Sequence, residues 1–246
     1  MNKLPAITLS FWIMKICATT LGETAGDLLS MTMNVGYALS SGILLSFFFA
    51  TLAVQLSTNK FHPLIYWAVI LSTSTAGTTI SDYMDRTLGL GYATGSLILV
   101  SLLTATLIIW KLTEKSLSVT NIKSLRGEVF YWTAILFSNT LGTALGDFLA
   151  DNSGLGFAGG AILIGSLLTF IVLAYYFGKV SPVILFWLAF VLTRPFGATF
   201  GDLLTKTHEK GGLNFGTICS SCILFAILAI LVMISIIKLK KENKIT

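Results

Sequence analysis

Hydrophobic residues fall into long stretches that alternate with short polar segments along the chain. The stretches are residues 5–28, 38–56, 62–82, 92–111, 129–149, 156–178, 182–204 and 214–237. Each is close to the ~20 residues that a helix needs to cross the hydrocarbon core of a bilayer. The pattern therefore predicts an all-α, polytopic membrane protein whose eight transmembrane helices account for nearly the whole chain.

The composition agrees with this prediction. Of the 246 residues, 54% are hydrophobic and 11% are charged, and the mean hydropathy is +0.84. No ordinary soluble domain of this size has such a balance. The first apolar stretch is too long for a cleavable signal peptide and contains Lys15, so we expect it to remain as a helix.

Basic residues are distributed unevenly between the two sides of the predicted membrane. An even number of helices places both termini on one side, which also holds Lys3, Lys60, Lys111, Lys115, Lys123, Arg126, Lys179, Lys238, Lys240, Lys241 and Lys244. The other side holds Arg86, Lys206 and Lys210. Because basic loops stay in the cytoplasm, both termini are predicted to be cytoplasmic. This bias explains the net charge of +5 without a nucleic-acid partner.

One sequence pattern recurs without gaps in the first, third, fifth and seventh stretches. The four copies are FWIMKICATTLGETAGD (11–27), YWAVILSTSTAGTTISD (66–82), YWTAILFSNTLGTALGD (131–147) and FWLAFVLTRPFGATFGD (186–202). In each copy a tryptophan stands fifteen residues before an aspartate, and a glycine stands five residues before the same aspartate. The chain is therefore an internal repeat.

Each repeat contains two predicted helices, and four copies build a single membrane domain. The repeats are residues 1–57, 58–112, 129–178 and 179–237. The charged segment 113–128 is interpreted as a central cytoplasmic linker between two halves of four helices each. Because every repeat crosses the membrane an even number of times, the repeats are predicted to be parallel and not inverted.

The aromatic-Trp … Gly-x-x-x-Gly/Ser-Asp repeat resembles a bacterial family of multi-pass membrane proteins built from four tandem two-helix repeats of unknown function. The resemblance covers residues 4–236. It implies the fold and a location in the bacterial plasma (inner) membrane. It implies no activity, so the function has to be argued from the residues.

Small residues and tryptophans mark two levels of the repeated helices. The pairs Gly22/Gly26, Gly77/Ser81, Gly142/Gly146 and Gly197/Gly201 have the small-x-x-x-small spacing that lets membrane helices pack closely. The odd helices are therefore expected to pack against each other. Near their cytoplasmic starts lie Trp12, Trp67, Trp132 and Trp187. They are interpreted as an interfacial aromatic belt, with substrate stacking as the alternative.

A polar stripe follows one face of each odd helix and ends in the aspartate, because residues four apart share a face. The stripe residues are Lys15, Thr19, Glu23 and Asp27, then Ser74, Thr78 and Asp82, then Asn139, Thr143 and Asp147, then Arg194 and Asp202. An ionised aspartate facing lipid costs ~2.5–3.5 kcal/mol. The stripes should therefore face the protein interior.

The four aspartates are predicted to form a ring that, with Glu23, binds a cation. Oxygen ligands favour a hard cation such as Mn²⁺, Mg²⁺, Ca²⁺ or H⁺, which makes Asp27, Asp82, Asp147 and Asp202 the candidate metal ligands. The five acids outnumber the two bases of the stripes by three, which also suits a cation. In the structural alternative, the aspartates only end their helices and bond to loop amides.

The second candidate for a functional feature is a set of charged residues that occur in one repeat and not in the others: Lys15 and Glu23 in the first, and Arg194 in the fourth. If the repeats close around an axis, the first and the fourth are neighbours, so we expect an ion pair between Glu23 and Arg194. The pair either neutralises buried charge or serves as a gate or coupling element, and Arg194 and Lys15 are the candidates for gating or coupling. Pro195 is expected to kink its helix.

These features favour an integral membrane transporter of a small cation, for example a manganese-like divalent metal exporter that uses the aspartate ring. The alternatives are a transporter or channel for a small organic cation or polar metabolite, and a non-transporting membrane scaffold or sensor. An enzyme is not expected, because the sequence has no Ser/His/Asp set, histidine-rich metal site or nucleotide loop. No cofactor is predicted. The expected partners are the lipid bilayer and small cations or protons, and the sequence leaves the oligomeric state open.

Overall fold

The computed structural model describes residues 4–119, 122 and 124–242. Over these residues it contains eight long α-helices and no β-strand, which confirms the all-α prediction. The helices are α1 (Leu9–Asp27), α2 (Tyr37–Ser57), α3 (Pro63–Asp82), α4 (Gly91–Glu114), α5 (Leu125–Asp147), α6 (Gly156–Phe177), α7 (Pro182–Thr205) and α8 (Thr217–Glu242). Short helical turns follow four of them: η1 (Leu28–Thr32), η2 (Tyr83–Thr87), η4 (Phe148–Asn152) and η5 (His208–Lys210).

Five of the helices in the described part of the chain are long and apolar enough to cross a membrane. They are α2, α4, α6, α7 and α8. The other three are α1, α3 and α5, whose polar stripes lower their mean hydropathy. Segments of this length and composition are compatible with a membrane protein in contact with the lipid bilayer.

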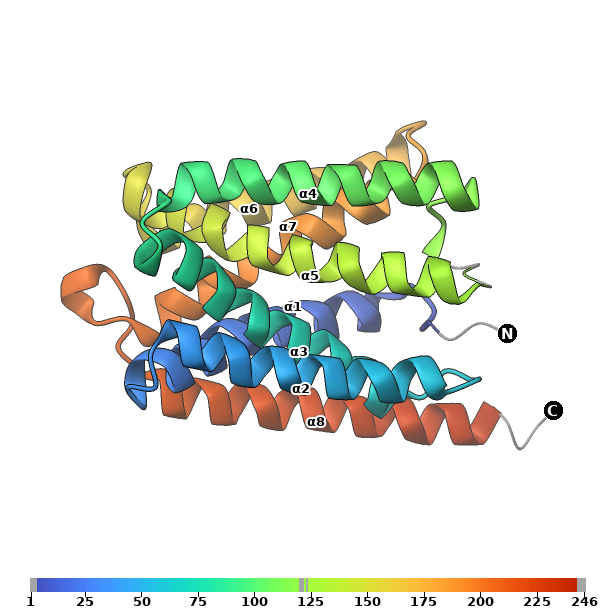
Figure 1. The fold of residues 1–246 in the computed structure, drawn as a ribbon, viewed down its shortest axis with the longest axis horizontal. Helices are drawn as coiled ribbons and strands as arrows, with labels where there is room; N and C mark the ends of the chain where they lie inside the picture. Colours follow the sequence, from blue (N-terminus) through green and yellow to red (C-terminus); the bar gives the residue numbers. More distant parts are fainter. Residues whose placement is uncertain (1–3, 120–121, 123, 243–246) are drawn as a thin grey trace.

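The helices form an inner bundle and an outer layer. Helices α1, α3, α5 and α7 pack in that order, and α7 packs on α1 to close the ring. Helices α2, α4, α6 and α8 pack on α3, α5, α7 and α1, respectively. Each outer helix thus lies on the inner helix of the following repeat, and the start of α1 and the end of α8 lie at the same end (Figure 1). The repeated helices therefore surround a common axis.

Glycines set the close approach of the inner helices, as the small-residue spacing predicts. A Cβ atom added at the first glycine of each pair would lie closer than 3.0 Å to the next inner helix, at Gly22 against Ser74, Gly77 against Thr140, Gly142 against Arg194 and Gly197 against Thr19. The last of these contacts joins the fourth repeat to the first. One packing rule therefore holds around the whole ring.

The linker between the two halves is shorter than the predicted segment 113–128. Helix α4 continues to Glu114 and α5 begins at Leu125, so helix occupies both ends of that segment. Three basic residues of the topology prediction, Lys3, Lys123 and Lys244, lie outside the described residues.

Candidate functional site

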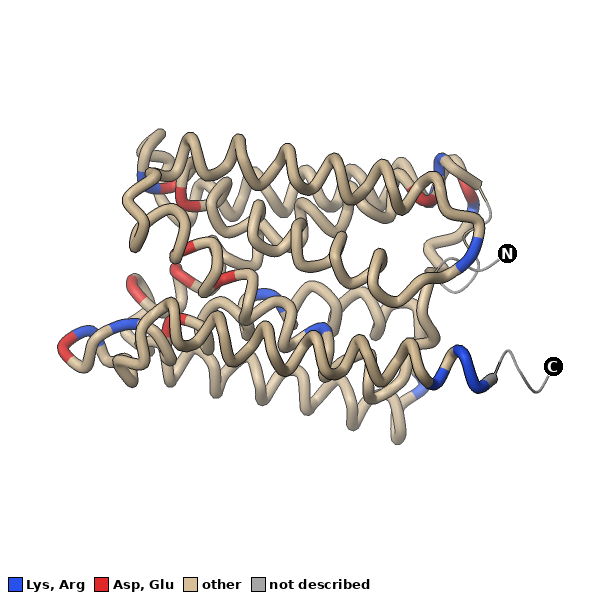
Figure 2. The backbone as a smooth tube through the Cα atoms, turned by 90° about the horizontal axis from the view of Figure 1, so that it is seen from below, with Lys and Arg blue, Asp and Glu red and all other residues tan. Residues whose placement is uncertain are grey.

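The four aspartates of the repeat lie together at one end of the inner bundle. Asp27, Asp82, Asp147 and Asp202 are buried, and they lie at or near the ends of α1, α3, α5 and α7. Most acidic positions gather at this end, which is remote from the termini (Figure 2). The predicted ring is thus present, and its carboxylates face the protein interior.

Arg86, in the turn after α3, joins two of these aspartates. Its Nε lies 3.0 Å from Oδ1 of Asp82, and one terminal nitrogen lies 3.0 Å from Oδ2 of Asp147. The other terminal nitrogen donates to the hydroxyl of Tyr37 (3.3 Å), and the guanidinium lies 6.0 and 5.8 Å from the ring centroids of Tyr37 and Tyr92. Arg86 is therefore held by two carboxylates and two aromatic rings.

Lys206, directly after α7, joins the other two aspartates. Its Nζ lies 2.5 Å from Oδ2 of Asp27 and 3.0 Å from Oδ1 of Asp202. Burial alone would lower the pKa of Lys206, but the carboxylates of Asp202 and Asp27 raise it above its ordinary value. The side chain is therefore charged at neutral pH, and the ring consists of two bridged pairs of aspartates.

Sequence reasoning did not assign Arg86 and Lys206 to the site. Their spacing could have shown one of the two aspartate contacts that each of them makes. Both stand four residues after the aspartate of their repeat, where the first and third repeats have Met31 and Asp151. With these two, the five acids of the site face four bases, the others being Lys15 and Arg194. The negative surplus is therefore one and not three.

The ion pair expected between the first and fourth repeats is confirmed. Arg194 donates to Oε2 of Glu23 at 2.9 Å, and the two side chains are 0% and 3% exposed. The same nitrogen donates to the hydroxyls of Thr78 and Thr143, each at 2.6 Å. Helices α1, α3, α5 and α7 all contribute to this cluster, so it lies on the axis of the inner bundle.

Lys15 is fully buried and lies next to an amide and an aromatic ring. Its Nζ donates to Oδ1 of Asn139 (3.3 Å) and lies 4.0 Å from the ring centroid of Phe190. Asn139 in turn donates to the hydroxyl of Thr73 (2.9 Å), which orients its oxygen toward the lysine. No carboxylate lies within ion-pair distance of Lys15 in the part of the chain that the structure describes. A charge at this position has no local compensation.

Replacing Lys15 with methionine should raise the free energy of unfolding by about 1 kcal/mol or more, because a buried amine with a single hydrogen-bond acceptor is exchanged for an apolar chain of similar length. Chemical denaturation in detergent, compared with Lys60→Met at an exposed site, measures the change. A clear loss of stability in Lys15→Met would mean that the contacts of this lysine hold the bundle together.

The remaining polar stripe residues also lie inside the inner bundle. The hydroxyl of Thr19 donates to the backbone oxygen of Thr193 on α7 (3.1 Å). Ser74 is fully buried, and its hydroxyl has no hydrogen-bond partner among the described residues. The structure thus brings every predicted stripe residue to the interior of the bundle.

Three carboxylates approach each other closely enough to share a cation. One oxygen each of Glu23, Asp147 and Asp202 lies within 4.8 Å of the others, and all three residues are buried. Hard cations accept such oxygen ligands. Each of these acids also has a basic partner, so a bound cation would have to compete with side-chain cations.

Three of the four repeated tryptophans are buried in the bundle and do not face outward as an interfacial belt would. Trp67, Trp132 and Trp187 are 3%, 0% and 6% exposed, and Trp12 is partly buried. They lie inside the bundle because α2, α4, α6 and α8 cover the inner helices. Trp110 of α4, which sequence reasoning did not single out, is buried with them and packs on Trp187 at a centroid distance of 5.7 Å.

Aromatic side chains fill the bundle at the end opposite the aspartates. The hydroxyls of Tyr66 and Tyr131 are hydrogen-bonded at 2.7 Å, and each ring packs on Trp132 with centroid distances of 5.5 and 5.0 Å. Phe11 packs in the same way on Trp67 at 5.7 Å. The charged interior is thus closed at this end by packed rings.

Comparison with known families assigns the whole repeated part of the chain. The family described as Repeat of Unknown Function (DUF347) matches four times, over residues 10–61, 65–116, 130–181 and 185–238. Each match contains one inner and one outer helix, which confirms the repeat predicted from the sequence. No curated protein and no solved structure matches the chain. The chain therefore belongs to the DUF347 repeat family.

Proposed function

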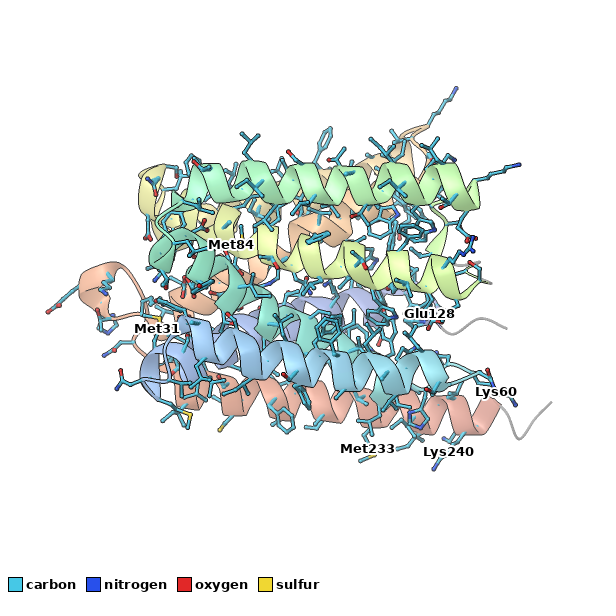
Figure 3. The ribbon with its side chains drawn as sticks, viewed as in Figure 1. Met31, Lys60, Met84, Glu128, Met233 and Lys240 are labelled. Atoms are coloured by element: carbon cyan, nitrogen blue, oxygen red, sulfur yellow. The ribbon has the colours of Figure 1, made fainter. Side chains whose placement is uncertain are left out.

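We propose that the chain spans the bacterial inner membrane with eight helices and has both termini in the cytoplasm. The five apolar helices support this, and α1, α3 and α5 can cross with them because their polar stripes face inward. Lys60 and Lys240 lie at the end opposite Met31 and Met84 (Figure 3). Basic residues at the end with the termini favour the cytoplasm for that end.

Within this topology, the protein transports a small cation along the axis of the inner bundle. The observation that carries the proposal is the convergence of the Glu23, Asp147 and Asp202 carboxylates to within 4.8 Å in the interior of the bundle. Ionisable groups inside a membrane are costly and mark ion or proton pathways. Carboxylate and hydroxyl oxygens suit Mn²⁺, Mg²⁺, Ca²⁺ or protons, and a manganese-like exporter is one form of this activity.

The arrangement corresponds to an occluded state of such a transporter. Packed rings close the end with the termini, and the side chains of Arg86 and Lys206 bridge the aspartates at the other end. A cation can reach the carboxylates only when a basic side chain leaves or a proton is exchanged. Transport would therefore be coupled to a movement of charge within the protein.

A scaffold or sensor without transport is the second candidate, and the ion pairs of the ring favour it. Each aspartate already has a basic partner, so the ring can stabilise the fold without a ligand. Transport of an organic cation has less support, because the aromatic surfaces that would stack on it are packed on each other.

Changing Asp147 to asparagine separates these candidates. In proteoliposomes, flux of Mn²⁺, Mg²⁺ or Ca²⁺, measured with and without a proton gradient, should fall at least about tenfold, because one of the converging carboxylates is lost. Asp151→Asn, four residues away and exposed, is the matched control and should keep its flux. Absence of flux in the native protein, together with a loss of stability in Asp147→Asn, would favour the scaffold. Flux that persists unchanged in Asp147→Asn would contradict a transport path through these carboxylates.

A further inference from the structure

A cavity of about 190 Å³ lies beside Lys206, at the end of the bundle that carries the aspartates. It is bordered by the end of α1 with the turn after it, by the end of α7 and the following loop, and by the start of α8. Asp27, Thr205, Lys206 and Lys210 are among its lining residues. The cavity therefore leads to one of the two bridged aspartate pairs.

One residue that lines this cavity, Thr205, has a polar group without a partner among the described residues. Thr205 is 7% exposed, and its hydroxyl has no hydrogen-bond partner among the described residues. Buried hydroxyls are normally satisfied, so this one, on a residue that lines the cavity, indicates a contact with water, a ligand or a side chain that moves. This observation is independent of the acidic cluster.

The two bridging cations are held very differently. Arg86 is the more exposed of the two side chains, at 31% against 17%, but it has two aromatic contacts and the Tyr37 hydroxyl in addition to its carboxylates. Lys206 is held by its two carboxylates alone among the described residues. An ammonium on a flexible stem can leave such a site, whereas a guanidinium fixed on several sides cannot leave as easily.

The backbone at Lys206 is fixed, so that only the side chain is free to move. Its N–H donates to the backbone oxygen of Asp202 (2.9 Å), and its own backbone oxygen accepts from Asn214 (2.9 Å). The adjacent cavity offers room for the displaced ammonium. Displacement therefore requires rotation of one side chain and no refolding of the loop.

We propose that Lys206 is a displaceable internal cation: a small metal cation that enters through the cavity binds Asp27 and Asp202 in its place, and the lysine side chain moves into the cavity. The inference rests on the proposed function for the class of the cation. It assigns different roles to the two bridges, with Lys206 as the moving gate and Arg86 as a fixed clamp between α3 and α5.

Labelling of lysines with a membrane-impermeant amine-reactive ester tests this displacement in the full-length protein. Lys210 lines the same cavity and is exposed, so its labelling is the internal reference. With increasing Mn²⁺ and at constant ionic strength, labelling of Lys206 should rise several-fold relative to Lys210, as read by peptide mass spectrometry. In Asp27→Asn, Lys206 should label more without metal and lose its response to Mn²⁺.

Two matched variants separate the gate from the clamp. Lys206→Gln removes the competing charge, so the apparent affinity for Mn²⁺, measured by a metal-dependent thermal shift, should increase about tenfold. Arg86→Gln should lower the unfolding temperature without that gain. The assignment of Lys206 as gate and Arg86 as clamp would be overturned if the two variants changed the affinity for Mn²⁺ equally. It would also be overturned if the labelling of Lys206 did not change with Mn²⁺, Mg²⁺ or Ca²⁺.

The results also distinguish this inference from the proposed function. Suppose that Asp147→Asn abolishes flux but the labelling of Lys206 does not depend on metal. This combination overturns the gate and leaves transport in place. Metal-dependent labelling in a protein that shows no flux supports the displacement at Asp27 and Asp202 and overturns transport.

Discussion

Replacing Arg194 with methionine should lower the free energy of unfolding by about 3–5 kcal/mol, which is the cost of removing one partner of a buried ion pair. Arg194 is fully buried and donates to Glu23 and to the hydroxyls of Thr78 and Thr143. Methionine fills a similar volume, so the loss reflects charge and hydrogen bonding more than a cavity. Chemical denaturation in detergent micelles, followed by circular dichroism, measures it.

The double variant Arg194→Met with Glu23→Gln is the control for this result. Because it removes both charges, it should recover a large part of the lost stability, and the difference from the single variant gives the coupling between the two residues. A single variant that loses less than about 1 kcal/mol would contradict the charged pair, since removal of a partner would then leave no uncompensated charge.

Gly197→Ala and Gly77→Ala should each cost about 2–3 kcal/mol through overpacking. At Gly197 the added Cβ atom would lie 2.8 Å from the backbone carbon of Thr19, and at Gly77 it would lie 2.9 Å from the backbone nitrogen of Thr140. Backbone atoms cannot rotate away as a side chain can, so the inner helices must separate. The same denaturation experiment measures the loss.

Gly42→Ala provides the comparison for these two variants. Gly42 lies within α2, and an added Cβ atom there would meet no other atom within 4 Å. We expect no loss of stability. If Gly197→Ala were as stable as Gly42→Ala, the contact between α7 and α1 that closes the ring would be looser than described.

The polar face of the inner helices was predictable because it depends on local spacing and on the cost of charge in lipid. Steps of four residues placed Glu23 and Asp27 on one face, and closure of four repeats made Glu23 and Arg194 neighbours. The ion pair at 2.9 Å confirms this reasoning. It needed no knowledge of side-chain rotamers, because two isolated charges on adjacent helices have few other partners.

The partners of the aspartate ring were not predictable in the same way. The spacing of four residues relates Arg86 to Asp82 and Lys206 to Asp202, but the contacts of Arg86 with Asp147 and of Lys206 with Asp27 join separate helices. Which helix lies beside which, and on which side the long basic chains extend, depends on packing. From the sequence, the site therefore had an excess of acidic side chains, whereas in the structure Arg86 and Lys206 each bridge two of the aspartates.

By itself the sequence determined the repeat, the helices and the inward face of the polar stripes, because hydrophobic period, glycine spacing and the cost of burying charge act locally along each segment. Only the tertiary structure decided that three of the four repeated tryptophans are buried and that Arg86 and Lys206 close the ring. Burial of a residue on an inner helix depends on which outer helix covers it, and here that helix comes from a different repeat. Contacts between repeats are set by the packing of the whole bundle, and no single segment encodes them.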